Sequence, residues 1–196
     1  MHDRMGVLKD LERRELPRRD SILIGEMGFA YGSPDMPGSR YIATSGVLSC
    51  IVLAAYNHQF KVGLIAHITG DIFVPDALSR AMQIRADSVA FFGGSAIDKQ
   101  ASGTSISTII ALEKGVRGSP MKVVGRDVLR GDEIRGDAIA MDTENGTFFV
   151  PSGCEEPQAA WYSNEWIKID EQGNRSYRMV YQGTLPQEGF AALVRS

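Results

Sequence analysis

The sequence predicts an α+β domain in which mixed β-sheet is layered against helices on one face. Two apolar runs, Ile51–Tyr56 and Val62–Ile68, are separated by a short polar turn, as in a buried β-hairpin. The apolar spacing becomes helical over residues 71–86 and again over residues 106–113. Further short apolar runs follow, and Asn145-Gly146 marks another hairpin. Strands and helices are therefore both expected, with the first hairpin at the centre.

The turn of that central hairpin is predicted at Asn57–Phe60. If Tyr56 lies opposite Lys61, then Cys50 lies directly opposite His67. Directly opposed Cβ atoms are about 4.5–5.5 Å apart, which lets a thiol and an imidazole form a hydrogen bond. A cysteine nucleophile with a histidine base requires this contact. Because both faces of the hairpin are apolar, we expect it to be central in its sheet and covered on both sides.

The segments around the hairpin have less regular patterns. Residues 1–16 are predicted to form a short helix or an arm that ends at Pro17. Residues 21–25 are predicted as a strand and residues 28–37, rich in Gly and Pro, as a loop. Pro75 is predicted to open the first helix.

Downstream, two more strands and a closing hairpin are expected before residue 151. The strands are predicted at 88–92, 121–124, 138–141 and 147–150, the last two paired across Asn145-Gly146. Gly93-Gly94 lacks the spacing and the lysine of a phosphate-binding loop, so we interpret it as a tight turn.

The C-terminal residues 151–196 are predicted to form an extension built on a β-hairpin, with strands at 166–170 and 177–182. Cys154 precedes two glutamates, which disfavour its thiolate and make it a weaker nucleophile candidate than Cys50. Five aromatic residues cluster in the extension, and core packing is favoured over an interaction surface for them. They are Trp161, Tyr162, Trp166, Tyr177 and Tyr181.

Composition excludes several classes of function. The net charge of -3 provides no basic field for nucleic acid, and no apolar run reaches the roughly 18 residues of a membrane span. The charged first twenty residues contain no signal-peptide core. Two cysteines do not form a disulfide framework, so a reducing cytoplasm is expected, and a secreted effector stays open as an alternative. The cysteines and His2, His58 and His67 fit no zinc spacing, so neither a metal nor a cofactor is expected.

The segment from Thr44 to His67 resembles the CheD family of bacterial chemoreceptor glutamine deamidases. Thr44 precedes Cys50 by six residues and His67 follows it by seventeen, as in that family. Weaker likeness extends over about residues 20–150. It includes Gly46, Ser49, Gly63, the upstream segment Ile22–Gly28, the segment Phe92–Ala96 and residues 131–150. Leu48, Ala66 and the absence of a proline shortly after His67 depart from the family pattern.

The resemblance implies a CheD-like catalytic domain at residues 20–150, preceded by an arm or helix at 1–19 and followed by the 151–196 extension. It implies that Cys50 is the nucleophile, His67 its base and Thr44 the group that orients the imidazole. Backbone N–H groups of Ser49 and Cys50 would bind the oxyanion. The implied reaction converts substrate Gln to Glu, releasing ammonia through a thioester. The implied partners are a protein with an exposed Gln, such as a chemoreceptor, and a regulatory protein.

Several alternatives use the same residues. A cysteine protease, a transglutaminase or a toxin-type deamidase acting on another protein would share the Cys-His dyad. A CheD-like binding module would leave Cys50 idle, and we expect an inert thiol at neutral pH in that case. His58 is the second candidate base, but the predicted turn exposes it to solvent far from Cys50.

Overall fold

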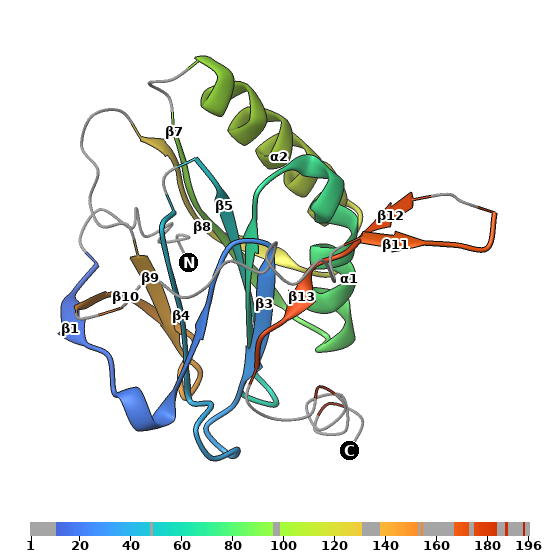
Figure 1. Cartoon of the computed structure of the whole chain (residues 1–196). Helices are drawn as coiled ribbons and strands as arrows, with labels where there is room; N and C mark the ends of the chain where they lie inside the picture. Colours follow the sequence, from blue (N-terminus) through green and yellow to red (C-terminus); the bar gives the residue numbers. More distant parts are fainter. Residues whose placement is uncertain are drawn as a thin grey trace.

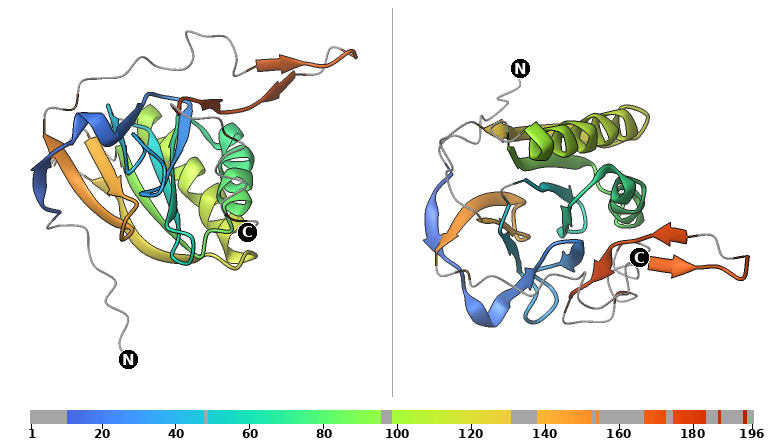
Figure 2. Two further views of the ribbon diagram at one scale, coloured as in Figure 1. Left: turned by 90° about the horizontal axis from the view of Figure 1, so that it is seen from below. Right: turned by 45° about the horizontal axis from the view of Figure 1, so that its top comes forward.

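Two β-sheets and two helices stack in three layers, which confirms the α+β sandwich with helices on one face (Figures 1 and 2). The computed structural model describes residues 11–47, 49–95, 99–130, 138–152, 154, 167–172, 175–183, 187 and 194. None of the helices in this described part is long and apolar enough to cross a membrane.

The larger sheet has the central hairpin in its middle. Its described strands lie in the order β13-β3-β6-β5-β7-β8. Every residue of β5 and β6 is buried, which confirms that the hairpin is covered on both faces. The strands are β3 (Gly28–Gly32), β5 (Ile51–Asn57), β6 (Val62–Ile68), β7 (Ser88–Ser95), β8 (Lys122–Arg130) and β13 (Val180–Tyr181).

The smaller sheet packs on one face of the larger one. Its described strands lie in the order β1-β10-β9-β4-β2. Branched and small apolar side chains of both sheets fill the space between them, with Val52 and Ile65 from the larger sheet against Ile42 and Met141 from the smaller. The strands are β1 (Arg13–Glu15), β2 (Ser21–Ile24), β4 (Tyr41–Ser45), β9 (Ala138–Asp142) and β10 (Thr147–Ser152).

Helices α1 (Val74–Gln83) and α2 (Lys99–Arg117) cover the opposite face of the larger sheet. Side chains that alternate with those of the inter-sheet core, such as Leu53 and Leu64, point to this helical side. Pro75 lies in the first turn of α1, as predicted, after a single 3-10 turn at Asp71–Phe73. Successive side chains of β5 and β6 therefore belong alternately to the core between the sheets and to the core under the helices.

The loop predicted at residues 28–37 is wrong in its first half. Gly28–Gly32 is the buried strand β3, paired with β6. Its glycines suggested a turn, but they are needed because other groups pack closely against this backbone. A Cβ at Gly28 would lie 1.9 Å from Gln182 Oε1. The chain turns only after Gly32.

The N-terminal and C-terminal segments both contribute strands to the body of the domain. Arg13–Glu15 pairs with β10, so this part of the predicted arm or helix is a strand, while residues 1–10 lie outside the described residues. At the other end, β13 runs parallel to β3 at the edge of the larger sheet. Strand β13 of the extension therefore belongs to the larger sheet.

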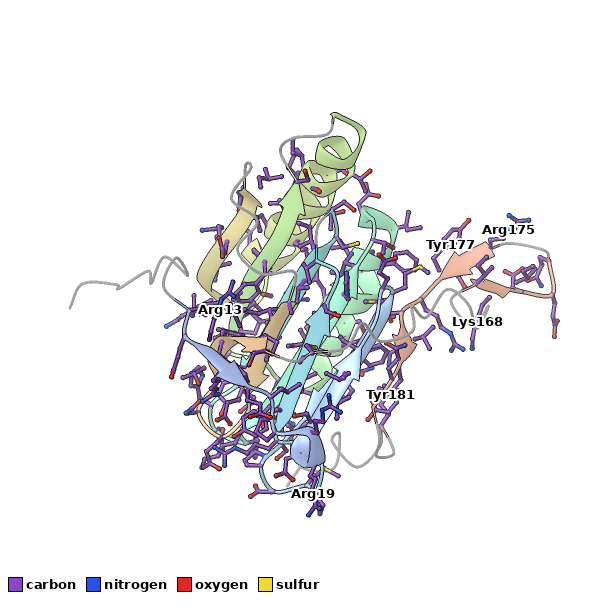
Figure 3. All side chains as sticks on the ribbon, turned by 60° about the vertical axis from the view of Figure 1, so that its left-hand side comes forward. Arg13, Arg19, Lys168, Arg175, Tyr177 and Tyr181 are labelled. Atoms are coloured by element: carbon purple, nitrogen blue, oxygen red, sulfur yellow. The ribbon has the colours of Figure 1, made fainter. Side chains whose placement is uncertain are left out.

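The predicted C-terminal hairpin is present as β11 (Ile167–Ile169) and β12 (Arg175–Tyr177), which project from the body (Figure 1). The expected strand 177–182 is interrupted after Tyr177. Figure 3 shows Tyr177 on the projecting hairpin and Tyr181 close to the body, where its ring is 5.3 Å from that of Phe29. Of the two described aromatic residues of the extension, Tyr181 packs in the core and Tyr177 is exposed. Trp161, Tyr162 and Trp166 lie outside the described residues.

Candidate active site

The hairpin that carries Cys50 and His67 has a different register from the predicted one. His67 pairs with Val52, not with Cys50, so the expected direct opposition is wrong by two residues. A shift of two preserves the face to which each side chain points. Cys50 and His67 are therefore diagonal neighbours on the face that meets the smaller sheet.

Asn57 causes this shift, because it continues the strand instead of starting the turn. It pairs with Val62, its Nδ2 donates to the carbonyls of Ile84 and Arg85, and its Oδ1 accepts from the Phe60 N–H at 2.9 Å. Lys61 adopts a left-handed φ of 50° and closes the loop. A buried side-chain cap of this kind has no signature in strand periodicity.

The diagonal arrangement still brings the sulfur and the ring together. Cys50 Sγ, a ring nitrogen of His67 and a carboxylate oxygen of Glu26 lie within 4.8 Å of one another. Cys50 is 6% exposed and follows the exposed Ser49, so the sulfur lies just below the surface. The site is at the end of the inter-sheet core.

Thr44 reaches His67 from the smaller sheet, where the resemblance predicted an orienting group. Its Oγ1 lies 2.7 Å from His67 Nδ1 and donates to the Ile24 carbonyl at 2.8 Å. Because a hydroxyl has one proton, which the Ile24 carbonyl receives, Thr44 must accept from Nδ1–H. The other nitrogen, Nε2, is then unprotonated. It is buried and has no hydrogen-bond partner among the described residues.

Glu26 belongs to the site although no motif in the sequence points to it. It is half-buried in the turn between β2 and β3, and its Oε1 accepts from the Cys50 thiol at 3.9 Å. The Met27 N–H donates to the His67 carbonyl at 2.9 Å, and Met27 has a left-handed φ of 57°. Long-range pairing of β3 with β6 positions this turn, so only the fold could reveal Glu26.

Burial keeps the dyad neutral. Burial and the negative charge of Glu26 raise the pKa of Cys50 to about 12, against a small lowering by the Ser49 hydroxyl. Burial lowers the pKa of His67 to about 4. Both shifts disfavour a resting thiolate–imidazolium pair. A cysteine nucleophile in this environment would have to transfer its proton to Nε2 during attack, not before it.

Strand β7 approaches the cysteine from the side opposite β6. Gly93 and Gly94 extend this strand instead of forming the predicted turn, with φ of 90° and 84°. A Cβ at Gly93 would lie 2.5 Å from the Cys50 carbonyl oxygen, so only glycine fits there. The Gly94 N–H donates to that carbonyl at 2.9 Å, which joins the end of β7 to the cysteine.

Two other candidates lie away from the site. His58 is exposed in the hairpin turn, as expected, and its Nδ1 pairs with Asp87. Cys154 is half-buried and packs against the outer face of the smaller sheet. The structure thus brings together Thr44, Cys50 and His67, adds Glu26 to them, and separates His58 and Cys154.

No protein-family model matches this chain, and no curated protein matches it significantly. The likeness to CheD proteins therefore stays an interpretation of the residues between Thr44 and His67.

Proposed function

We propose that this protein is a thiol-dependent protein-glutamine deamidase. The observation that carries the proposal is the set of hydrogen bonds from the Ile24 carbonyl through Thr44 to His67. They leave Nε2 unprotonated on a ring that has a nitrogen within 4.8 Å of Cys50 Sγ. A nucleophile, a base and a group that orients the base are the components of a hydrolytic triad.

The proposed reaction begins when a substrate Gln side chain meets Cys50. The thiol proton moves to His67 Nε2 as the sulfur forms a bond to the carboxamide carbon. The resulting oxyanion accepts a hydrogen bond from the Cys50 N–H, and such a donor contributes about 2.7–4 kcal/mol. His67 then gives its proton to the departing nitrogen, which leaves as ammonia. Water attacks the thioester with His67 as base, and the products are Glu and the free thiol.

Glu26 favours an amide over a carboxylate as the substrate group at the site. A carboxylate accepts hydrogen bonds from the NH2 of a carboxamide but repels a carboxylate. Glu26 Oε1 lies 3.9 Å from the sulfur and is close enough to contact the leaving nitrogen. The same charge that favours Gln as substrate disfavours Glu as a bound product.

We further propose that the substrate is a protein with an exposed Gln, with chemoreceptors as the first candidate because of the family resemblance, and that a regulatory protein binds the enzyme in the cytoplasm. Each deamidation adds one negative charge to the substrate. Such a change alters pairing with neighbouring charges on a signalling protein.

The second candidate function is a binding module, and the low exposure and raised pKa of Cys50 favour it. Thiol alkylation does not separate the two candidates, because an enzyme that deprotonates Cys50 only during attack also has an inert resting thiol. Product analysis separates them.

The test is incubation of the purified protein with bacterial lysate proteins, followed by mass spectrometry for Gln-to-Glu conversion. Cys50→Ser is the inactive control and Cys154→Ser the matched control. The proposal predicts site-specific conversion by the wild type and by Cys154→Ser, and none by Cys50→Ser. Peptide cleavage or amine incorporation instead would indicate a protease or a transglutaminase, and conversion equal in all three samples would contradict the proposal.

A further inference from the structure

Three side chains at the candidate site form a set of metal-binding groups that the spacing of Cys and His in the sequence does not reveal. A carboxylate oxygen of Glu26, the sulfur of Cys50 and a ring nitrogen of His67 lie within 4.8 Å of one another. In tetrahedral zinc sites, Zn–S is about 2.3 Å and Zn–N or Zn–O about 2.0–2.2 Å, so ligand atoms are roughly 3.3–3.6 Å apart. The Cys50–Glu26 separation of 3.9 Å already approaches this value.

His67 supplies an independent indication of a ligand. Its side chain is fully buried, and Nε2 has no hydrogen-bond partner among the described residues. A buried nitrogen lone pair without a partner is costly, and a cation satisfies it. Since Nδ1 is bonded to Thr44, Nε2 is the nitrogen free to bind one.

Thr44 holds His67 as a metal ligand is usually held. Histidines that bind zinc donate their other ring N–H to an oxygen atom, which fixes the tautomer and the ring orientation. Thr44 Oγ1 accepts from Nδ1–H at 2.7 Å and is itself fixed by the Ile24 carbonyl. The imidazole is therefore preorganised, whereas the Glu26 side chain is only half-buried.

We infer that Glu26, Cys50 and His67 bind one Zn²⁺ ion and leave its fourth position open to water. One thiolate, one imidazole and one carboxylate suit zinc and exclude Mg²⁺ and Ca²⁺, which prefer oxygen ligands alone. Binding displaces the Cys50 thiol proton to solvent, so that the sulfur binds as thiolate.

Zinc at this position occupies both groups that deamidation needs. The sulfur electron pair and Nε2 are bound to the metal, so neither attack nor proton transfer can occur. Zinc is then a reversible inhibitor, and the deamidation rate depends on the concentration of available zinc. This consequence rests on the proposed deamidase function, whereas the metal site itself does not.

The test is titration of the full chain, without substrate, with Zn²⁺ in competition with a chromophoric chelator, and with Co²⁺ followed by absorption. The inference predicts one Zn²⁺ per chain and a sulfur-to-cobalt charge-transfer band. Cys50→Ser should lose the band, and Glu26→Gln should weaken zinc binding at least tenfold. Thr44→Val should weaken it about 10- to 100-fold, while Thr44→Ser restores it.

Cys154→Ser and His58→Ala are the matched controls and should bind like the wild type. Binding that survives in Cys50→Ser, or that disappears in Cys154→Ser, would overturn the inference, as would a cobalt complex without the charge-transfer band. Circular dichroism of each variant separates lost ligands from lost folding. Deamidation is measured separately with chelator present, so failure of the zinc site and failure of the proposed function give different results.

Discussion

The two ends of the β5–β6 hairpin each carry a histidine, and the two environments are opposite. His58 at the turn is exposed, with its Nδ1 on the carboxylate of Asp87. His67 at the other end is fully buried, with its Nδ1 on the neutral hydroxyl of Thr44. Charged pairs surround the turn, including Lys61–Glu144 and Arg40–Asp142. At the other end, among the residues that the structure describes, Glu26 is the one carboxylate in the cluster with Cys50 and His67. The two histidines of one hairpin therefore differ in burial and in ring partners, and these differences make His67 the proposed base.

Exchange of each histidine for Ala gives the largest expected contrast. His67→Ala removes the base and should lower the rate of Gln-to-Glu conversion by at least about 10²–10⁴-fold. His58→Ala should leave the rate within twofold, because its ring lies at the far end of the hairpin. Quantitative mass spectrometry of the converted substrate peptide measures both. An equal loss of conversion rate in the two variants would contradict the assignment of different roles to His67 and His58.

Thr44→Val tests what orients the buried ring. The variant keeps the shape of the side chain but leaves Nδ1–H and the Ile24 carbonyl without their partner. We expect a loss of conversion rate smaller than the about 10⁴-fold caused by removing a triad carboxylate. Unfolding free energy should also fall by about 1–3 kcal/mol. Thr44→Ser retains the hydroxyl and should recover most of the conversion rate and most of the unfolding free energy. A Thr44→Val protein with the rate and stability of the wild type would refute the role.

Gly93→Ala tests the close approach of β7 to the cysteine end. The new Cβ would lie 2.5 Å from the Cys50 carbonyl oxygen, at a residue whose φ is 90°. We expect a loss of unfolding free energy of about 1–3 kcal/mol in urea denaturation. Gly70→Ala is the matched control, since nothing lies within 4 Å of its Cβ position and its φ is extended. A control as unstable as Gly93→Ala would show that the contact is not the cause.

Acid should weaken the turn end, where buried Asp142 pairs with Arg40 and Arg14. Burial acts to raise the pKa of Asp142, but the hydrogen bond from Arg40 and other contacts outweigh it and lower the pKa. A lowered folded pKa gives stability that is complete above the unfolded value of about 3.9 and is lost as pH falls through the folded value.

Urea denaturation between neutral pH and pH 3 checks this. Asp142→Asn should be less stable at neutral pH, by about 1–3 kcal/mol, and should lose less stability than the wild type on acidification. Parallel acid profiles for the two proteins would show that Asp142 is not the group responsible.

Local patterns predicted the two strands of the central hairpin, the helix start at Pro75 and the shared face of Cys50 and His67, because these depend on side-chain period and turn chemistry. The register could not be predicted, since it depends on the Asn57 side chain capping the loop and bonding to Ile84 and Arg85. Strand β3 was missed because its glycines serve close packing instead of turning. Glu26 depends on pairing between distant strands, which no local pattern records.

The most direct test of the central claim is the rate of Gln-to-Glu conversion by the metal-free wild type and by Cys50→Ser, followed by mass spectrometry on the same substrate preparation. The account predicts conversion at defined Gln residues that disappears with the sulfur. Conversion that persists at the same sites and rate in Cys50→Ser would contradict it.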